Sequence, residues 1–512
     1  MTVYTAPRTW HTRLRALLAS LRPIHAAPLL AVLALTAWGL ASPMGGSPDD
    51  DFHLTSAWCA NDLRSDLCAE GPTAEERVVP EAVLGAGCFV REPEKSAACQ
   101  YRDVSFDPTE TQATDRGNFR GGYPPVYYAV MNVFIGGDIL ASVFLMRFVS
   151  ILLFVGLGTA LFALLPPVRR PSFAWGWMVS TVPLALYIIP SNNPSSWAVI
   201  GVGISWLALL GWFETKGRRK IGLGIVFAFA ALMAGGARSD AAVYIVLGIG
   251  VVIILTVRRD RRWLRDAILP AVVVPLALVS VLTSQQSISA VEGFGGTGSD
   301  AAAAAPNVVT LVAYNLLNLP YLWSGAFGSW ALGWFDTALP AVVVYGSLAC
   351  FVAVATLGFG SLNRRKAIAL GAIGSALIVL PVYVLSVGGD RIGVEVQPRY
   401  LLPFIVLFAG VLALQAGARL FNPTRGQTIL IVATLSIVQF IALHTTIRRY
   451  VTGTDEAGWN LDAGHEWWWP TPFSPMAVLV IGSVAYAGLL VILAREVSGR
   501  RALLTAESQV AA

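Results

Sequence analysis

The sequence predicts an all-α, polytopic integral membrane protein with about twelve transmembrane helices. Of its 512 residues, 55% are hydrophobic and only 13% are charged, and the mean hydropathy is +0.63. A soluble chain of this length would need more charge to cover its surface. The charged residues are also grouped between long apolar runs, as in a chain that crosses a bilayer repeatedly.

Each predicted span has close to the ~20 residues that a bilayer requires. If the spans alternate from a cytoplasmic N-terminus, 23 of the 36 Lys and Arg residues face the cytoplasm, and 26 of the 31 Asp and Glu residues face outward. This sorting follows the positive-inside rule and places both termini of a cell-membrane protein in the cytoplasm. The basic N-terminus covers 1–25, the transmembrane domain 26–494 and the cytoplasmic tail 495–512; the predicted spans are 26–42, 139–165, 172–190, 195–213, 221–237, 241–257, 267–285, 339–360, 367–387, 400–418, 427–445 and 475–494.

The first span also resembles a signal peptide, because the basic residues Arg8, Arg13, Arg15 and Arg22 precede it. No convincing small-x-small cleavage site follows it, so we expect an uncleaved helix. The basic inner loops should orient the helices and bind anionic membrane lipid, and no nucleic-acid partner is expected.

Most of the non-membrane chain lies in three predicted outer loops, 43–138, 286–338 and 446–474. The first of these loops contains Cys59, Cys68, Cys88 and Cys99. Four cysteines in an oxidising compartment indicate two disulfides, most simply Cys59–Cys68 and Cys88–Cys99. A zinc site is the alternative, although the spacings are not those of a CxxC motif.

The first outer loop begins with three adjacent carboxylates, Asp49, Asp50 and Asp51, followed by His53. Holding like charges together beside a membrane is costly, so such a cluster usually performs chemistry or holds a cation. Asp49 could cap a short helix that places Asp50 and His53 one turn apart on one face. That pair could bind a divalent cation such as Mg²⁺, Mn²⁺ or Zn²⁺; alternatively, His53 orients a catalytic carboxylate or is a simple loop histidine.

Two aromatic segments flank the predicted membrane surface. The segment 123–128, with Tyr123, Tyr127 and Tyr128, should open a helix that reaches about Ile135 and is too short to cross a bilayer. We expect it to lie along the outer leaflet before Asp138 starts the second span. Trp467, Trp468 and Trp469 end the last outer loop, as an interfacial belt or as a site that stacks on a sugar or acceptor.

Three motifs in this order resemble those of a bacterial family of predicted membrane proteins of unknown function. The family carries Pro-Asp-Glu-x-x-His after its first helix, then Tyr-Pro-Pro-Leu-Tyr-Tyr, and later Gln-Gly-Arg-Tyr-Leu-Leu-Pro. Here the motifs fall at 48–53, 123–128 and 397–403, with Asp50 in place of the Glu and Pro398 in place of the Gly. The family in turn resembles the GT-C glycosyltransferases, multi-span enzymes that use polyprenyl-phosphate sugars.

The resemblance implies an inverting transfer of a sugar from a polyprenyl-phosphate donor to a cell-envelope glycan, lipid or protein on the outer face. In such an enzyme, Asp49 or Asp50 would accept the proton of the acceptor hydroxyl, and Arg399 would receive the phosphate of the leaving lipid. Arg238 and Arg147 are further candidates for the phosphate. Donor or acceptor contacts are expected from Tyr123, Tyr127, Tyr128, Gln397, Tyr400, Trp467 and Trp468.

Each basic candidate also has a structural interpretation. Arg399 could extend to the interface as an anchor, and Arg238 could pair with Asp240. Arg147 lies inside the second span, where a charge costs about 2.5 kcal/mol or more unless it is partnered. It could reach the same pocket or pair with a buried acid.

Two other functions remain open at this point: a transporter or flippase of lipid-linked glycans, whose charges would lie near the bilayer midplane, and a non-catalytic envelope-assembly subunit. The abundance of Ala, Gly and Arg favours a GC-rich bacterium such as an actinobacterium. In that lineage, a decaprenyl-phosphate pentose or mannose would be the expected donor.

Overall fold

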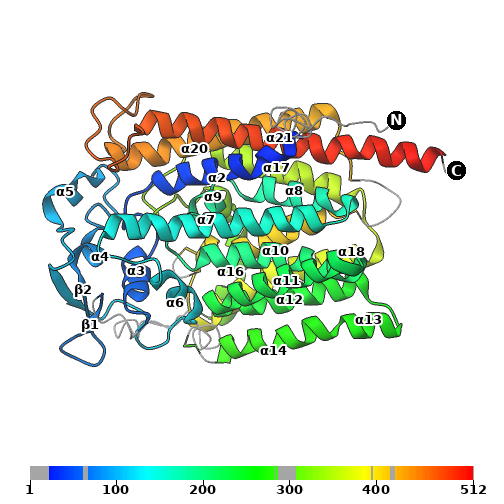
Figure 1. Ribbon diagram of the computed structural model, residues 1–512, viewed down its shortest axis with the longest axis horizontal. Helices are drawn as coiled ribbons and strands as arrows, with labels where there is room; N and C mark the ends of the chain where they lie inside the picture. The colour runs from blue at the N-terminus through cyan, green and yellow to red at the C-terminus, as the bar shows by residue number, and fades with distance from the viewer. Residues whose placement is uncertain are drawn as a thin grey trace, which may run out of the picture.

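The chain forms a bundle of helices that run along the long axis of the molecule, with a small irregular domain at one end (Figure 1). The computed structural model describes residues 22–61, 67–282, 284–285, 307–393, 396–415 and 421–510, and the side chains as far as residue 498. The elements of the bundle are η1 (Pro23–Ala26), α2 (Ala27–Leu40), α7 (Ile139–Leu164), η3 (Pro167–Arg169), α8 (Arg170–Ser180), α9 (Leu184–Ile188), α10 (Ser195–Glu214), α11 (Gly217–Ala237), α12 (Ser239–Thr256), α13 (Arg261–Asp266), α14 (Ile268–Leu282), α16 (Val308–Ser324), η4 (Gly325–Phe327), α17 (Ala341–Phe359), α18 (Arg364–Gly388), α19 (Pro398–Leu412), α20 (Arg425–Val451) and α21 (Pro475–Val510).

The polytopic, mostly helical character predicted from the sequence is confirmed. Within the described residues, ten helical segments are long and apolar enough to cross a membrane. The other two predicted spans correspond to shorter helices: the third is divided into α8 and α9, and the tenth is the 15-residue helix α19. The second span starts at Asp138 as predicted, and the carboxylate of Asp138 caps it by accepting the backbone N–H of Ala141 at 2.9 Å.

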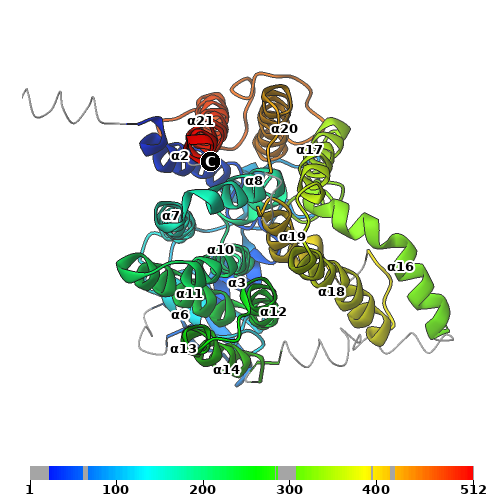
Figure 2. The same ribbon diagram turned by 90° about the vertical axis from the view of Figure 1, so that its right-hand side faces the viewer.

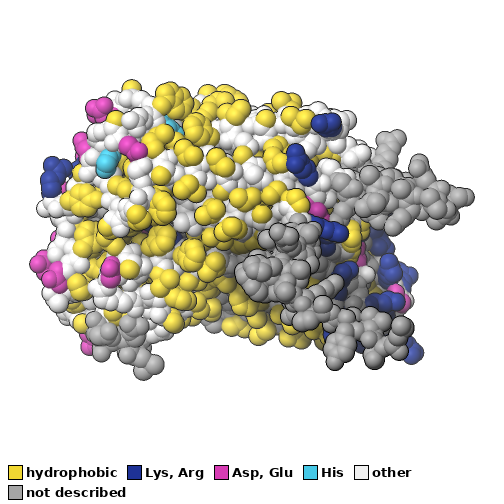
Figure 3. Space-filling model, turned by 45° about the horizontal axis from the view of Figure 1, so that its top comes forward, with side chains coloured by type: hydrophobic (Ala, Val, Ile, Leu, Met, Phe, Trp, Pro, Cys, Tyr) yellow, Lys and Arg dark blue, Asp and Glu magenta, His cyan; other side chains and the backbone are white. Residues whose placement is uncertain are grey.

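The surface is divided into an apolar band and two polar ends (Figure 3). Carboxylates gather at the end that carries both disulfides, here called the disulfide end, and Lys and Arg side chains gather at the opposite end, the basic end. Helix α2 begins and helix α21 ends at the basic end (Figure 1). A band of apolar side chains between two polar ends is the surface expected of a multi-pass membrane protein.

Helix α10 lies at the centre of the bundle, where it packs against α11, α12 and α19 (Figure 2). It is apolar on all sides, which suits a helix enclosed by other helices. Helices α8 and α19 meet closely because both contribute glycine: a Cβ on Gly176 would lie 2.8 Å from the Cα of Gly410. This contact fixes α19, which carries Arg399 in its first turn at the disulfide end.

The domain at the disulfide end comes mainly from the first loop and includes a three-stranded antiparallel sheet that the sequence did not predict. Its strands are too short to leave a periodic pattern. The predicted disulfides Cys59–Cys68 and Cys88–Cys99 are both present, so the zinc alternative for these cysteines is wrong. The elements are α3 (Asp50–Trp58), β1 (Ala69–Glu70), β2 (Arg77–Pro80), α4 (Glu81–Gly85), η2 (Ala97–Cys99), α5 (Gln100–Asp103), β3 (Thr111–Thr114) and α6 (Val126–Asn132).

The predicted loop 286–338 contains further helical structure. Residues 286–306 lie outside the described residues, but α16 follows them and packs against α18 (Figure 2). Several large apolar side chains of α16, including Val309 and Leu317, are exposed. Exposed apolar side chains on a helix beside the apolar band fit contact with lipid rather than with water.

Candidate functional site

Asp49 and Arg399 meet at the disulfide end, although 350 positions separate them in the chain. One terminal nitrogen of Arg399, Nη2, lies 2.5 Å from Oδ2 of Asp49. Asp49 has a φ of 58°, in the left-handed region that non-glycine residues seldom adopt, and its side chain does not cap α3. The capping interpretation of Asp49 is therefore wrong. The carboxylate instead faces two guanidinium groups, those of Arg399 and Arg116.

The two members of this pair differ in exposure and in how their polar atoms are satisfied. The side chain of Asp49 is 32% exposed, whereas that of Arg399 is 3% exposed. Two other nitrogens of Arg399, Nε and Nη1, are buried without a hydrogen-bond partner, and so is Oε1 of the neighbouring Gln397. A buried polar atom without a partner costs free energy, so the two nitrogens of Arg399 mark a place where an anionic group would be stabilised, whereas Oε1 of Gln397 would accept from a hydroxyl.

A second guanidinium lies beside the first, across the ring of Tyr400. The guanidinium carbon of Arg399 lies 5.2 Å from the centre of this ring, and that of Arg238 lies 4.6 Å from it. Arg238 also stacks on Tyr123 and holds both carboxylate oxygens of Asp240 at 2.9 Å. The predicted pairing of Arg238 with Asp240 is thus confirmed, and Arg238 fixes both tyrosines.

Burial controls the protonation of the groups around Asp49. It works to raise the pKa of Asp49, but Arg399 and then His53 and Arg116 bring this pKa below its ordinary value, so the carboxylate is ionised. Burial lowers the pKa of His53 to about 3, so this imidazole is neutral. Burial raises the pKa of Tyr123 to about 12, so its hydroxyl keeps its proton at neutral pH.

Asp50 and Arg147 form a second pair, and both side chains are completely buried. Nη1 of Arg147 donates to the carbonyl oxygens of Gly39 and Ser42, and Nη2 donates to that of Pro43 and lies 3.8 Å from Asp50. Asp50 accepts the backbone N–H of Gly45 at 3.1 Å. Of the two interpretations of Arg147, the structure supports the pairing with a buried acid, because its terminal nitrogens hold the end of α2.

His53 is buried in a cluster of tyrosines, close enough to Asp49 for the two groups to affect each other's pKa. Its Nδ1 lies 2.9 Å from the hydroxyl of Tyr128, while its Nε2 is buried without a partner. The ring of Tyr127 packs edge-on against Trp197. Tyr127 and Tyr128, both expected as substrate contacts, are therefore buried core residues, and the ring of Tyr128 packs against that of Tyr123.

The predicted cation site on Asp50 and His53 does not fit these contacts. The carboxylate of Asp50 faces Arg147 and backbone N–H groups, and a metal ion placed there would be repelled by the guanidinium. Across the residues with described positions, no three His, Cys, Asp or Glu side chains form a group able to hold a metal.

The tryptophans of the last outer loop are packed inside it. Trp467 contacts Trp468 and Trp469 ring to ring at 6.0 and 5.5 Å, and all three are buried. Nε1 of Trp469 donates to the carbonyl of Leu40 at the end of α2. Both interpretations based on exposed rings, the belt and the stacking platform, therefore disagree with the observed burial of Trp467 and Trp468.

Several residues that hold the site were not predicted. Arg116 binds Asp51 at 2.8 Å and also approaches Asp49. Tyr187 and Asn193 donate to the backbone of the loop before Asp49, at the carbonyls of Gly46 and Pro48. The only available sequence signal was the polar run 191–196 between two apolar spans, which is too polar for a simple turn inside a membrane protein.

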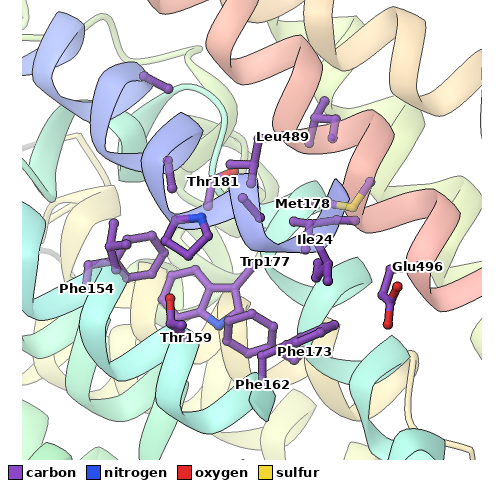
Figure 4. A pocket seen from close by; sticks show the side chains of 18 of the residues that line it. Ile24, Phe154, Thr159, Phe162, Phe173, Trp177, Met178, Thr181, Leu489 and Glu496 are labelled. Atoms are coloured by element: carbon purple, nitrogen blue, oxygen red, sulfur yellow. The ribbon is translucent and has the colours of Figure 1, made fainter. Parts of the chain in front are cut away.

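A separate apolar crevice of about 440 Å³ lies toward the basic end, between α2, α7, α8 and α21 (Figure 4). Phe154, Phe162, Phe173 and Trp177 line it, and Glu496 stands at its edge. An apolar lining suits a lipid chain and not a sugar. The Asp49–Arg399 pair does not line this crevice, so the two features are distinct.

These observations define a multi-pass membrane protein with an acid–guanidinium site at its disulfide end. The chain belongs to the family described as Predicted membrane protein (DUF2142), which matches residues 32–408 and thus well over half of its length. The predicted membership in a family of membrane proteins of unknown function is thereby confirmed. The matched segment contains Asp49, Tyr123, Arg238 and Arg399. No curated protein matches the chain.

Proposed function

We propose that this protein transfers a glycosyl group from a polyprenyl-phosphate sugar to a hydroxyl of a cell-envelope acceptor. The observation that carries this proposal is the arrangement at Arg399, which binds Asp49 at 2.5 Å while two of its buried nitrogens have no partner. A phosphate oxygen could occupy those nitrogens without displacing any existing hydrogen bond. One guanidinium would then lie between the base and the leaving group.

The chemistry needs one proton acceptor and one cation. An oxygen of the acceptor attacks the anomeric carbon of the donor sugar, and its proton passes to the carboxylate of Asp49. The bond between the anomeric carbon and the phosphate oxygen breaks, and its electron pair leaves with the polyprenyl phosphate. Arg399 stabilises that anion, and attack from the opposite face inverts the configuration of the sugar.

The donor itself would tune the base. In the free protein the neighbouring guanidinium groups keep the pKa of Asp49 low, which favours ionisation but weakens the carboxylate as a base. A bound phosphate would neutralise part of the charge on Arg399, so the pKa of Asp49 would rise when the donor arrives. Base strength would thus be coupled to the presence of donor.

The neighbours of Arg399 fit supporting roles. Because Arg238 is held by Asp240, most of its charge is balanced, and we assign it to positioning Tyr400 and Tyr123 beside the phosphate. Tyr123 stays protonated and could donate a hydrogen bond to the donor. Gln397, whose Oε1 is buried without a partner, is the second candidate contact.

The distribution of charge supports a reaction on the outer face. Basic clusters lie at the end opposite the site, and the disulfides lie beside it. With the basic end in the cytoplasm, as the positive-inside rule prescribes, both termini would be cytoplasmic and the site would face outward. A lipid-linked donor suits that side of the membrane, because nucleotide sugars remain in the cytoplasm.

The alternative, a transporter or flippase of lipid-linked glycans, needs polar groups along a path through the bilayer. Arg147 was the main candidate for such a group. Its Nη1 and Nη2 are occupied by the carbonyls of Gly39, Ser42 and Pro43, which favours the enzyme over the transporter.

The test is a transfer assay on the purified full-length protein in lipid nanodiscs. Radiolabelled polyprenyl-phosphate sugars would be incubated with envelope glycan, lipid and protein acceptors, and labelled products counted. We expect transfer with one donor class and release of free polyprenyl phosphate in equal amount. In a second assay, the protein is placed in sealed vesicles. If it moves intact donor across the membrane without transferring the sugar, the transporter alternative replaces this proposal.

A further inference from the structure

The disulfide end also carries an open cleft of about 640 Å³ with charged groups in its lining, distinct from the apolar crevice. Three segments that are far apart in the sequence form it: the chain around Arg91, the turn that follows Trp330, and the end of α20 with the residues after it. Its lining combines two aromatic rings with charged groups of both signs: Trp334, Phe335, Arg91, Arg448, Asp336 and Glu456.

The walls of the cleft are held firmly. Beneath it, Arg449 and Asp336 form a buried ion pair at 2.8 Å, and Arg449 also donates to the carbonyls of Phe89 and Lys95. Arg448 donates to the carbonyls of Gly458 and Asn460. Because its wall residues are fixed by these bonds, the cleft is preformed, as binding sites usually are.

The turn at 331–335 has an unusual backbone. Ala331, Gly333 and Phe335 have φ values of 65°, 62° and 63°, and two of these residues are not glycine. Such strain persists only where the surroundings enforce it, and it is common at ligand sites. Here Nε1 of Trp334 donates to the carbonyl of Gly45 at 2.8 Å, which ties the turn to the loop before Asp49.

Phe335 connects the cleft to the proposed reaction centre. Its side chain is 46% exposed and lines the cleft. It also lines a small cavity of about 20 Å³, whose other walls include Pro48, Gln397 and Arg399. The turn is thus the partition between the open cleft and the cavity beside the Asp49–Arg399 pair.

We infer that this cleft binds the acceptor, and that the acceptor is a glycan chain. The inference rests on the proposed function. Aromatic faces pack on the apolar faces of sugar rings, and carboxylates beside guanidinium groups satisfy hydroxyls that both donate and accept. The two carboxylates and two guanidinium groups of the lining carry no net charge, so they do not select a simple anion, and a lipid chain would leave these groups without polar partners. A hydroxyl at the end of the bound chain would pass Phe335 to reach Asp49.

The test uses full-length protein in nanodiscs and fluorescently labelled oligosaccharides released from cell-envelope polysaccharide. Binding is measured by anisotropy without donor, and the KM for the same oligosaccharides is measured with donor. Phe335→Ala and Glu456→Gln should each weaken binding and raise the KM by about tenfold, the loss expected for one stacking or charge-assisted contact. Phe473→Ala is the matched control, because Phe473 is 52% exposed and does not line the cleft.

The outcomes separate the two proposals. If Phe335→Ala and Glu456→Gln bind oligosaccharide as the wild type does, or if the wild type binds none, the acceptor cleft is wrong even where transfer occurs. If the variants lose binding while no donor supports transfer, the cleft stands as a glycan site and the transferase proposal fails. Equal losses in Phe473→Ala would also contradict the assignment.

Discussion

Two neighbouring aspartates have opposite surroundings. Asp49 is partly exposed and binds Arg399, two of whose nitrogens have no partner. Asp50 is fully buried and faces Arg147, whose two terminal nitrogens donate to three backbone carbonyls. Both pairs keep buried atoms without a partner, Nε and Nη1 of Arg399 in the first and Nε of Arg147 with Oδ1 of Asp50 in the second, but only the first pair has an exposed member that a ligand could reach. An ion pair therefore suggests a functional site when unfilled hydrogen-bonding capacity lies beside a member that is exposed.

The largest expected effect is on the proposed transfer, for which the first pair supplies the base. Asp49→Asn keeps the size of the side chain but cannot accept a proton, so the transfer rate should fall by about 10²–10⁴-fold, the usual contribution of a general base. The measurement is the initial rate of transfer in nanodiscs, with Asp107→Asn as the control because Asp107 is an exposed carboxylate that accepts the backbone N–H of Thr109. Full activity in folded Asp49→Asn protein would show that Asp49 is not the general base.

Arg399→Gln should reduce kcat/KM for the donor by about 10²–10³-fold, since it removes a charge aimed at the leaving group. The same variant should raise the pKa of Asp49. As the pH is lowered, activity should therefore begin to fall at a higher pH than in the wild type. Arg391→Gln is the control, because Arg391 is an exposed arginine that stacks on Tyr314 before α19 begins. Equal losses of kcat/KM in both variants would mean that overall surface charge, and not a contact between Arg399 and the leaving group, determines the rate.

The second pair should respond mainly in stability. Arg147→Met leaves Asp50 without its counter-charge and three carbonyls without donors, and the loss should be about 3–5 kcal/mol. Thermal unfolding in detergent would measure it. Replacing both residues, with Asp50→Leu added, should be less destabilising than the sum of the single changes. An Arg147→Met protein with normal stability and no activity would instead make Arg147 part of the site.

The smallest effect distinguishes the aspartates by their protonation. Burial raises the pKa of Asp50 to about 6, although Arg147 opposes the shift. Because this folded-state pKa lies above the unfolded value, the contribution of Asp50 to stability grows as the pH falls through 6. The pKa of Asp49 is lowered, so its contribution is lost only in stronger acid. Between pH 7 and 5, Asp50→Asn should reduce the dependence of stability on pH, and Asp49→Asn should leave this dependence unchanged. Melting temperatures measured across this range would test both.

The sequence predicted the features that depend on composition and local pattern. The apolar spans, the charge sorting, the disulfides and the pairing of Arg238 with Asp240 all follow from short-range rules. It also pointed to Asp49 and Arg399 through motifs in one family. It could not distinguish the tasks of Asp49 and Asp50, because both are aspartates in one motif and their partners are chosen by tertiary packing.

Other features were beyond local reasoning. The burial of Trp467 and Trp468 depends on how the last loop folds over α2. The cleft depends on Arg91, Phe335 and Arg448, which no motif connects. Contacts between residues hundreds of positions apart leave no periodic signal in one sequence.

The loop before Asp49 is held by groups from much later in the chain, including Trp334 and the hydroxyl of Tyr450. During synthesis the aspartates emerge first, but their final arrangement has to wait until α20 has been inserted. A nascent chain would therefore carry the carboxylates of the candidate site without their final partners. Activity would be acquired late in biogenesis, after almost the whole polypeptide has entered the membrane.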